Sequence, residues 1–288
     1  TTGTDNIAIG KDALSAKTTG AADVAIGHQA LQDADGGDAF NVAVGYRAGR
    51  NITTGIRNIV IGASAGDTLS TGVDNIAIGY QALSAEDTHS YNTAVGHQTL
   101  KAQDAGADAY NVAMGYRAGY AVTTGTKNVI VGGNAGDSLT SGVNNVAIGY
   151  DALKTEDAHG FTVAVGTYAL SNQDAGAEAY NVAVGYDAGG GNTTGTSNTT
   201  VGATAGRATT GDHNTAIGRD ALGTSNTASD NTAVGSSSLY AITTGDQNTA
   251  VGRQAGASIQ IADYNVAMGH RALFTCTDSS RNIAIGYK

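Results

Sequence analysis

The chain has 288 residues but contains no proline, no tryptophan and only three phenylalanines. Large globular cores normally draw on bulky aromatic residues, so this scarcity argues against an ordinary globular domain. The absence of proline beside 42 glycines also excludes collagen and proline-rich disorder. Cys276 is the single cysteine, which excludes a disulfide within the chain.

Positive charge and long apolar runs are also lacking. Lysine and arginine together number 15 against 25 acidic residues, and a net charge of −10 repels phosphate backbones, so we expect no nucleic-acid partner. No apolar run approaches the ~18 residues of a membrane-spanning helix, so we expect no membrane insertion by this segment. No Ser-His-Asp or Cys-His arrangement and no phosphate-binding glycine loop stands out, so we expect neither an enzyme nor a cofactor.

A five-residue unit, Asn–β-branched–small–apolar–Gly, recurs seventeen times along the chain, with a nearly constant interval of about 17 residues between its glycines. A period of this length is too short for a pair of helices and is typical of one coil of a β-solenoid. β-Branched residues favour a short strand in each unit, and the glycine lets the chain turn after it. The sequence therefore predicts an all-β protein, with residues 1–288 forming a single continuous β-solenoid of about 17 coils. Both ends fall within a repeat, so we interpret the chain as an internal segment of a longer protein.

A larger period is superimposed on the first. Three residues after most of the motif glycines comes alanine, followed by leucine or glycine. Two leucine coils alternate with two glycine coils, as at Leu14, Leu31, Gly49 and Gly66, until the phase slips near the C-terminal end. This alternation gives a super-period of about 70 residues.

Alternation along each strand places its two β-branched residues on one face and the small residue on the other. We expect the β-branched face inside, so that Ile7, Val24 and Val42 stack into an apolar core. The small residues would then form an outer column, and we expect this column to pack against other copies of the chain. Its members include Ala8, Ala25, Ala43, Ala77 and Ala94, with Val60, Ile130 and Thr200 as larger ones.

The asparagine that opens each unit predicts a ladder in which side-chain amides bond from coil to coil. Asp23 and Thr162 replace asparagine in two copies. The predicted ladder residues are Asn6, Asn41, Asn58, Asn75, Asn92, Asn111, Asn128, Asn145, Asn181, Asn198 and Asn214.

The motifs NIAIG, NVAVG and NTAVG, followed by Ala-Leu or Ala-Gly, resemble the head repeats of trimeric autotransporter adhesins. They are also similar to the NTAVGYQAL-type arrays of phage tail-fibre and related surface proteins. The resemblance covers essentially the whole chain. It implies a homotrimer of β-rolls, extracellular on a virion tail fibre or a bacterial cell surface, that is used for attachment. The spacing of the motif is longer here than is usual in adhesin heads, which favours the tail-fibre or filament-like branch.

The residue after each motif glycine belongs to a column rich in tyrosine and histidine. Amphipathic rings beside arginine can hold sugars or a protein ligand. The other interpretation is that these long side chains only cover the flank of the solenoid. The candidate binding residues are Tyr46, Arg47, Tyr80, His97, Tyr116, Arg117, Tyr150 and Tyr186.

Three acidic loops carry clustered carboxylates, at Asp33, Asp35, Asp38, Asp104, Asp108, Asp174 and Glu178. Such clusters can bind Ca²⁺, but none matches a twelve-residue or nonapeptide calcium loop, so we interpret them as solvated loops. His89 and His159 each follow Glu-Asp, one super-period apart. A metal site would need more converging ligands, so we expect both histidines to be surface residues.

These features favour an attachment fibre or adhesin segment, a trimeric β-rod that spaces and presents sites for a cell-surface glycan or protein receptor. The alternative is a purely structural subunit of a self-assembling extracellular filament or sheath. A third hypothesis is an ice-binding solenoid, although threonine occurs only intermittently on the strands, at Thr199, Thr215, Thr232 and Thr249.

Overall fold

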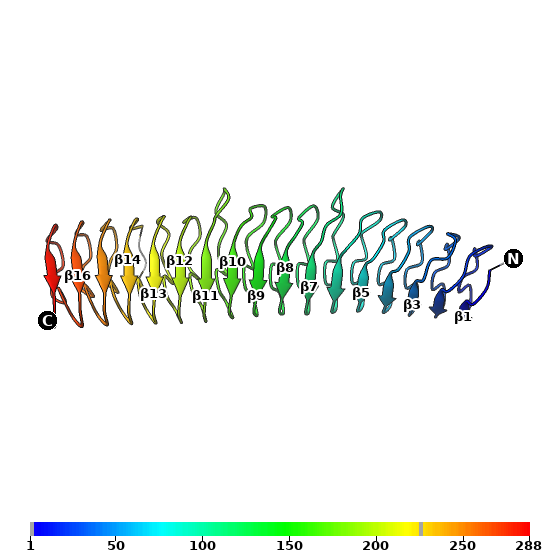
Figure 1. Ribbon diagram of the computed structural model, residues 1–288, viewed down its shortest axis with the longest axis horizontal. Helices are drawn as coiled ribbons and strands as arrows, with labels where there is room; N and C mark the ends of the chain where they lie inside the picture. The colour runs from blue at the N-terminus through cyan, green and yellow to red at the C-terminus, as the bar shows by residue number, and fades with distance from the viewer. Residues whose placement is uncertain (1–2, 225–226) are drawn as a thin grey trace. The chain divides into compact units, whose positions relative to one another are not determined.

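The computed structural model describes residues 3–224 and 227–288. They divide into two compact units, one ending at Asn145 and one beginning at Val146. Each unit is a parallel β-solenoid whose strands lie side by side in chain order (Figure 1). The predicted all-β solenoid, with a period of about 17 residues, is confirmed in each unit. The single continuous array over residues 1–288 stays a prediction, since it concerns how the units join.

Every described strand has three residues and lies at the centre of one motif copy. In the first unit the strands are β1 (Ile7–Ile9), β2 (Val24–Ile26), β3 (Val42–Val44), β4 (Ile59–Ile61), β5 (Ile76–Ile78), β6 (Thr93–Val95), β7 (Val112–Met114) and β8 (Val129–Val131). In the second they are β9 (Val146–Ile148), β10 (Val163–Val165), β11 (Val182–Val184), β12 (Thr199–Val201), β13 (Thr215–Ile217), β14 (Thr232–Val234), β15 (Thr249–Val251), β16 (Val266–Met268) and β17 (Ile283–Ile285).

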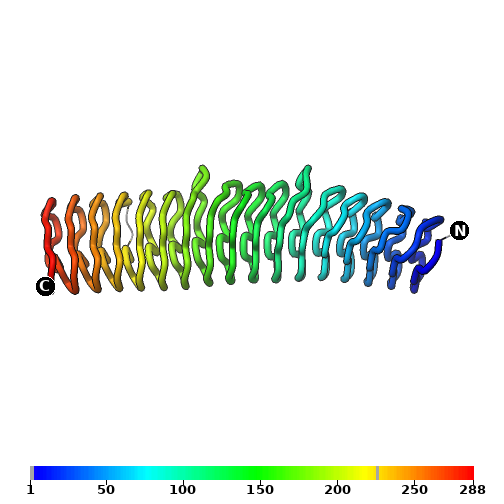
Figure 2. Tube along the Cα trace, in the orientation of Figure 1, coloured from blue at the N-terminus to red at the C-terminus, as the bar shows by residue number. Residues whose placement is uncertain are grey.

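Neighbouring strands within each unit pair in parallel, with equivalent residues opposite one another. Ile7 of β1 pairs with Val24 of β2, and Thr232 of β14 pairs with Thr249 of β15. Equivalent positions of successive coils therefore stack into columns that run along each unit. In the tube view, one loop in each unit rises above its neighbours, within the longest coil of that unit (Figure 2). These coils run from Gly96 to Gly115 and from Gly166 to Gly185.

The motif glycine turns the chain at the end of each strand. Gly45 has a φ of 140°, and a Cβ added there would lie 2.6 Å from the carbonyl oxygen of Gly62 in the next coil. An L-residue is strained at that φ, and the atom it would meet is backbone held in the stack. The prediction that glycine permits the turn is confirmed.

The prediction of which strand face lines the interior is wrong. Ala25, Ala43 and Val60, at the strand centres, are fully buried. Ile59 and Ile61, on either side of Val60, are 38% and 36% exposed. The column of small residues therefore lines the interior and cannot pack against other copies. The β-branched column that begins with Ile7, Val24 and Val42 lies on the outside and not in the core.

The width of the coil explains this reversal. The interior also receives the alanine and leucine that follow the motif glycine, such as Ala30 and Leu31, which are both fully buried. They fill the space opposite the strand, and close packing of the interior then leaves room for only a small residue at most strand centres. Alternation then directs the two β-branched residues outward.

The super-period also has a packing explanation. Some coils have glycine at the position where others have a buried leucine. In those coils a side chain from another position of the repeat fills the interior space that the leucine would occupy. A Cβ added to Gly49 would lie 2.8 Å from Ile52 Cδ1, and one added to Gly66 would lie 3.2 Å from Val60 Cγ1. Glycine coils and larger interior residues therefore occur together, which keeps the interior filled.

The motif asparagines form a ladder whose bonds run to the backbone as well as between amides. The backbone N–H of Asn58 donates to Asn41 Oδ1 (2.9 Å), and Asn58 Nδ2 donates to the carbonyl oxygen of Gly72 (2.8 Å). In the second unit, Asn248 Nδ2 also donates to Asn231 Oδ1 (3.1 Å). Of the predicted ladder residues, Asn6 is half-buried and the others are buried. The ladder thus satisfies backbone groups that the short strands leave inside.

Asp23 replaces the ladder asparagine in one coil and is paired with a buried lysine. Lys17 Nζ donates to Asp23 Oδ2 (2.8 Å) and also to the carbonyl oxygen of Gly37 (3.0 Å). Gly37 lies 14 residues after Asp23, the same offset that Asn41 Nδ2 spans to Gly55. Lys17 therefore supplies the donor that a carboxylate lacks.

Candidate binding surface

Two outward columns in each unit consist only of Ile, Val, Thr and Met. They are the first and third residues of every strand, and none of the seventeen motif copies has a charged residue at either position. Val112 and Met114 of β7 are 40% and 48% exposed. Monomeric proteins rarely expose apolar patches larger than a few hundred Å², and a larger patch marks an interaction site. We call these two columns the strand face.

The predicted aromatic column after the motif glycine is exposed and partly stacked. The rings of Tyr80, His97 and Tyr116 lie one above the next, with centroids 5.2 and 5.4 Å apart. Three consecutive coils of the first unit thus present a continuous ladder of rings with polar tips. Of the other predicted rings, Tyr46 stacks on His28 at 5.4 Å, and Tyr150 and Tyr186 both contact Tyr168 edge-on, at 5.8 and 6.1 Å.

The two predicted binding arginines are engaged in ion pairs within the first unit. Arg117 donates to both carboxylate oxygens of Asp137 (3.1 and 3.2 Å), and its guanidinium lies 4.2 Å from the centroid of the Tyr120 ring. Arg47 lies 3.4 Å from Asp67, and burial raises the pKa of that carboxyl although Arg47 opposes the shift. We therefore assign Arg47 and Arg117 to the cohesion of the coils and leave them out of the binding surface.

A second aromatic column escaped the sequence analysis. It occupies the position immediately before the motif asparagine, where φ is positive and the chain turns into the strand. The rings of Tyr91 and Tyr110 stack with centroids 4.9 Å apart, and those of Phe161 and Tyr180 stack at 5.3 Å. The signal was present in the sequence, because six motif copies are preceded by Phe or Tyr. Exposed tyrosine or phenylalanine rings therefore flank β3, β7 and β11 on both sides.

Two of the three acidic loops come together with the two histidines, which we treated as separate features. Glu86, Asp87, His89 and Asp104 form one cluster, in which one ligand atom of each residue lies within 4.8 Å of the others. Equivalent residues of the second unit form another, Glu156, Asp157, His159 and Asp174. Both histidines are half-buried, with the side chains of His89 and His159 14% and 24% exposed.

The remaining acidic loop, residues 33–38, belongs to neither of the clusters found among the described residues. Asp35 instead accepts hydrogen bonds from Thr18 Oγ1 (2.6 Å) and from the Thr18 backbone N–H (2.9 Å). These bonds lower the pKa of the Asp35 carboxyl. The Asp35 side chain therefore links two neighbouring coils by hydrogen bonds. We keep the interpretation of residues 33–38 as a solvated loop.

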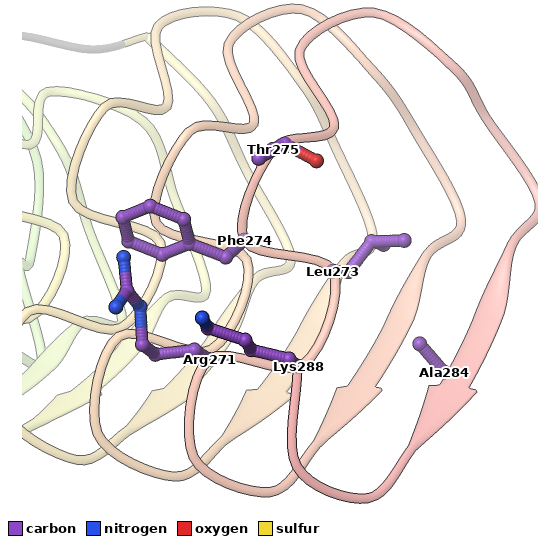
Figure 3. A pocket seen from close by; sticks show the side chains of 6 residues that line it. All are labelled: Arg271, Leu273, Phe274, Thr275, Ala284 and Lys288. Carbon is purple, nitrogen blue, oxygen red and sulfur yellow. The ribbon is translucent and has the colours of Figure 1, made fainter.

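A hollow near the last strand of the second unit is lined by six side chains (Figure 3). Arg271 and Phe274 lie together on one side of it, with the guanidinium 4.0 Å from the ring centroid. Leu273 and Ala284 pack against the interior of the preceding coils. The hollow therefore lies over the interior of the last described coil, and we assign no ligand to it.

No protein-family profile matches the chain, and no curated protein matches it significantly. Within the described residues there is no helix long and apolar enough to cross a membrane. The function must therefore be argued from the surface itself.

Proposed function

We propose that this chain is a segment of an extracellular attachment fibre, in which three copies associate along their strand faces and display their aromatic columns to a surface glycan. The observation that supports this proposal best is the strand face, two uncharged columns of β-branched and methionine side chains that are exposed or half-buried. An exposed apolar surface of this kind marks a protein–protein contact. A second copy presents the same surface, so self-association buries both at once.

The resemblance to adhesin-head and tail-fibre repeats supports three copies in preference to two. It also supports a location on a virion tail fibre or a bacterial cell surface. The reversal of the interior is consistent with this arrangement, since the large apolar side chains point outward, where other copies can cover them. Attachment is then a property of the aromatic columns, which would stay exposed at the edges of the strand face.

A single charge on the strand face tests the association. We expect Val112→Lys to shift the protein from three associated chains to one, raising the concentration for half-association by more than about a hundredfold, because an unpaired buried ammonium costs several kcal/mol. Sedimentation velocity over a range of concentrations measures the shift.

The matched control is Thr124→Lys, which adds the same charge at an exposed turn position of a neighbouring coil. It is expected to sediment like the unaltered protein. If both variants dissociate equally, or if neither does, the strand face is not the contact surface.

Truncating the stacked rings tests attachment. We expect the double variant Tyr80→Ala/Tyr116→Ala to lose at least about tenfold in glycan affinity, because aromatic residues at the centre of a binding surface are the ones whose truncation costs most. Binding of the labelled protein to a printed glycan array gives the measurement. Tyr240→Ala, which removes an exposed tyrosine outside both columns, is expected to bind normally. Equal binding by all three proteins would assign the rings to covering the flank of the solenoid.

A further inference from the structure

A loop in the first unit gathers three carboxylates and an imidazole from two successive coils. Glu86, Asp87 and His89 belong to one coil, and Asp104 opens the acidic loop of the next. One ligand atom from each of the four residues lies within 4.8 Å of the other three. His89 Nδ1 is 2.7 Å from Glu86 Oε1 and 3.8 Å from Asp104 Oδ1. The separations suit a single ion placed between them.

The decisive member of this cluster is Glu86. Its side chain is fully buried, and its Oε1 accepts from the backbone N–H of His89 (3.1 Å). Its Oε2 is also buried but has no hydrogen-bond partner among the residues that the structure describes. A buried carboxylate oxygen without a partner is costly, and a cation bound by the carboxylate would compensate for it.

We infer that Glu86, Asp87, His89 and Asp104 bind a divalent transition-metal ion of the Zn²⁺ type. A site made of oxygens alone would favour Ca²⁺ or Mg²⁺, whereas the imidazole nitrogen favours Zn²⁺ and its neighbours in the transition series. Binding needs the lone pair of His89 Nδ1, so the Nδ1–Glu86 hydrogen bond is replaced by two bonds to the metal. The neutral imidazole then carries its one proton on Nε2, and a proton displaced from Nδ1 is released to solvent.

The equivalent cluster of the second unit provides an internal comparison. There Gln173 Nε2 donates to Glu156 Oε2 (3.1 Å) and also contacts Thr162 Oγ1 (3.2 Å). The buried carboxylate oxygen is therefore already satisfied. In the first unit the corresponding glutamine, Gln103, donates instead to the carbonyl oxygen of Thr123 (3.3 Å). The first site is thus the one that lacks a compensating partner, and we assign the metal to it.

The experiment is isothermal titration calorimetry, in which the purified full chain is titrated with ZnCl₂ and, separately, with CaCl₂. We expect Zn²⁺ to bind at one site per chain more tightly than Ca²⁺. Asp104→Asn removes a ligand from an exposed loop without disturbing the interior, and it should weaken Zn²⁺ binding by at least about tenfold, since even outer partners of metal sites contribute 10–100-fold. Asp108→Asn, in the same loop but outside the cluster, should bind as the unaltered chain does.

Thermal unfolding of the same proteins gives an independent readout. Zn²⁺ should raise the midpoint of the unaltered chain and of Asp108→Asn, and it should leave that of Asp104→Asn nearly unchanged. The inference is overturned if Zn²⁺ does not bind, if Ca²⁺ binds more tightly, or if Asp104→Asn and Asp108→Asn bind Zn²⁺ equally. Sedimentation of the unaltered chain with a chelator present reports on self-association separately, so a failure of the metal site does not decide the fibre proposal.

Discussion

Gly45→Ala is expected to destabilise the first unit by roughly 3–5 kcal/mol, because it combines a strained φ with a backbone collision. The added Cβ would meet the Gly62 carbonyl oxygen at 2.6 Å and its carbonyl carbon at 2.7 Å. Neither atom can withdraw without breaking the register of β3 against β4. Since each coil of a solenoid contacts only its neighbours, the damage should centre on these two strands.

Urea unfolding followed by circular dichroism measures the loss of stability, and amide hydrogen exchange locates it. The control is Gly37→Ala in the same unit. Gly37 does not have a positive φ, and a Cβ there would meet nothing within 4 Å. Its effect should stay within about 0.5 kcal/mol. Equal effects of the two substitutions would contradict the stacked-glycine turn.

Lys17→Met should also cost roughly 3–5 kcal/mol, because it leaves the Asp23 carboxylate buried without its partner. The side chains of Lys17 and Asp23 are 5% and 0% exposed. The substitution also removes the donor to the carbonyl oxygens of Gly36 and Gly37. Methionine has an apolar stem of similar length, so the loss of stability reports on charge and hydrogen bonding more than on packing.

The double variant Lys17→Met/Asp23→Asn is expected to recover most of the stability. Asparagine restores the ladder residue found in fifteen of the seventeen motif copies, and its Nδ2 can reach Gly37 as Asn41 Nδ2 reaches Gly55. Urea unfolding of the two single variants and the double variant completes a double-mutant cycle. If the double variant is no more stable than Lys17→Met alone, then Lys17 does not substitute for the missing amide.

The sequence was sufficient for the period, the strands and the turns. Each depends on a local property repeated along the chain, such as the β-branched pair around Ala43 or the glycine at position 45. The asparagine ladder was likewise visible, although the number of its bonds to the backbone was not. Alternation could not say which strand face lies inside, because it separates two faces without assigning either. That choice depends on the buried leucines of the second half of the coil, such as Leu31, which fill the space opposite the strand.

The candidate sites were predicted less completely for a related reason. The exposure of the rings of Tyr80 and Tyr116 follows from their place after the motif glycine. The contacts of Arg117 depend on a carboxylate 20 residues away, in the next coil. The metal cluster likewise joins Glu86 to Asp104 across two coils, and a comparison of loops one by one does not bring them together. An alignment of successive repeats, with equivalent positions in columns, would have shown that these partners lie in neighbouring coils.

The most direct test of the fibre proposal is the mass of the purified protein in solution, measured by light scattering over a wide range of concentrations. Association along the strand face predicts three times the chain mass of 28.6 kDa, in discrete particles. A mass of one chain at every concentration would contradict it. Open-ended polymers of increasing mass would also contradict it, and would favour a structural filament instead.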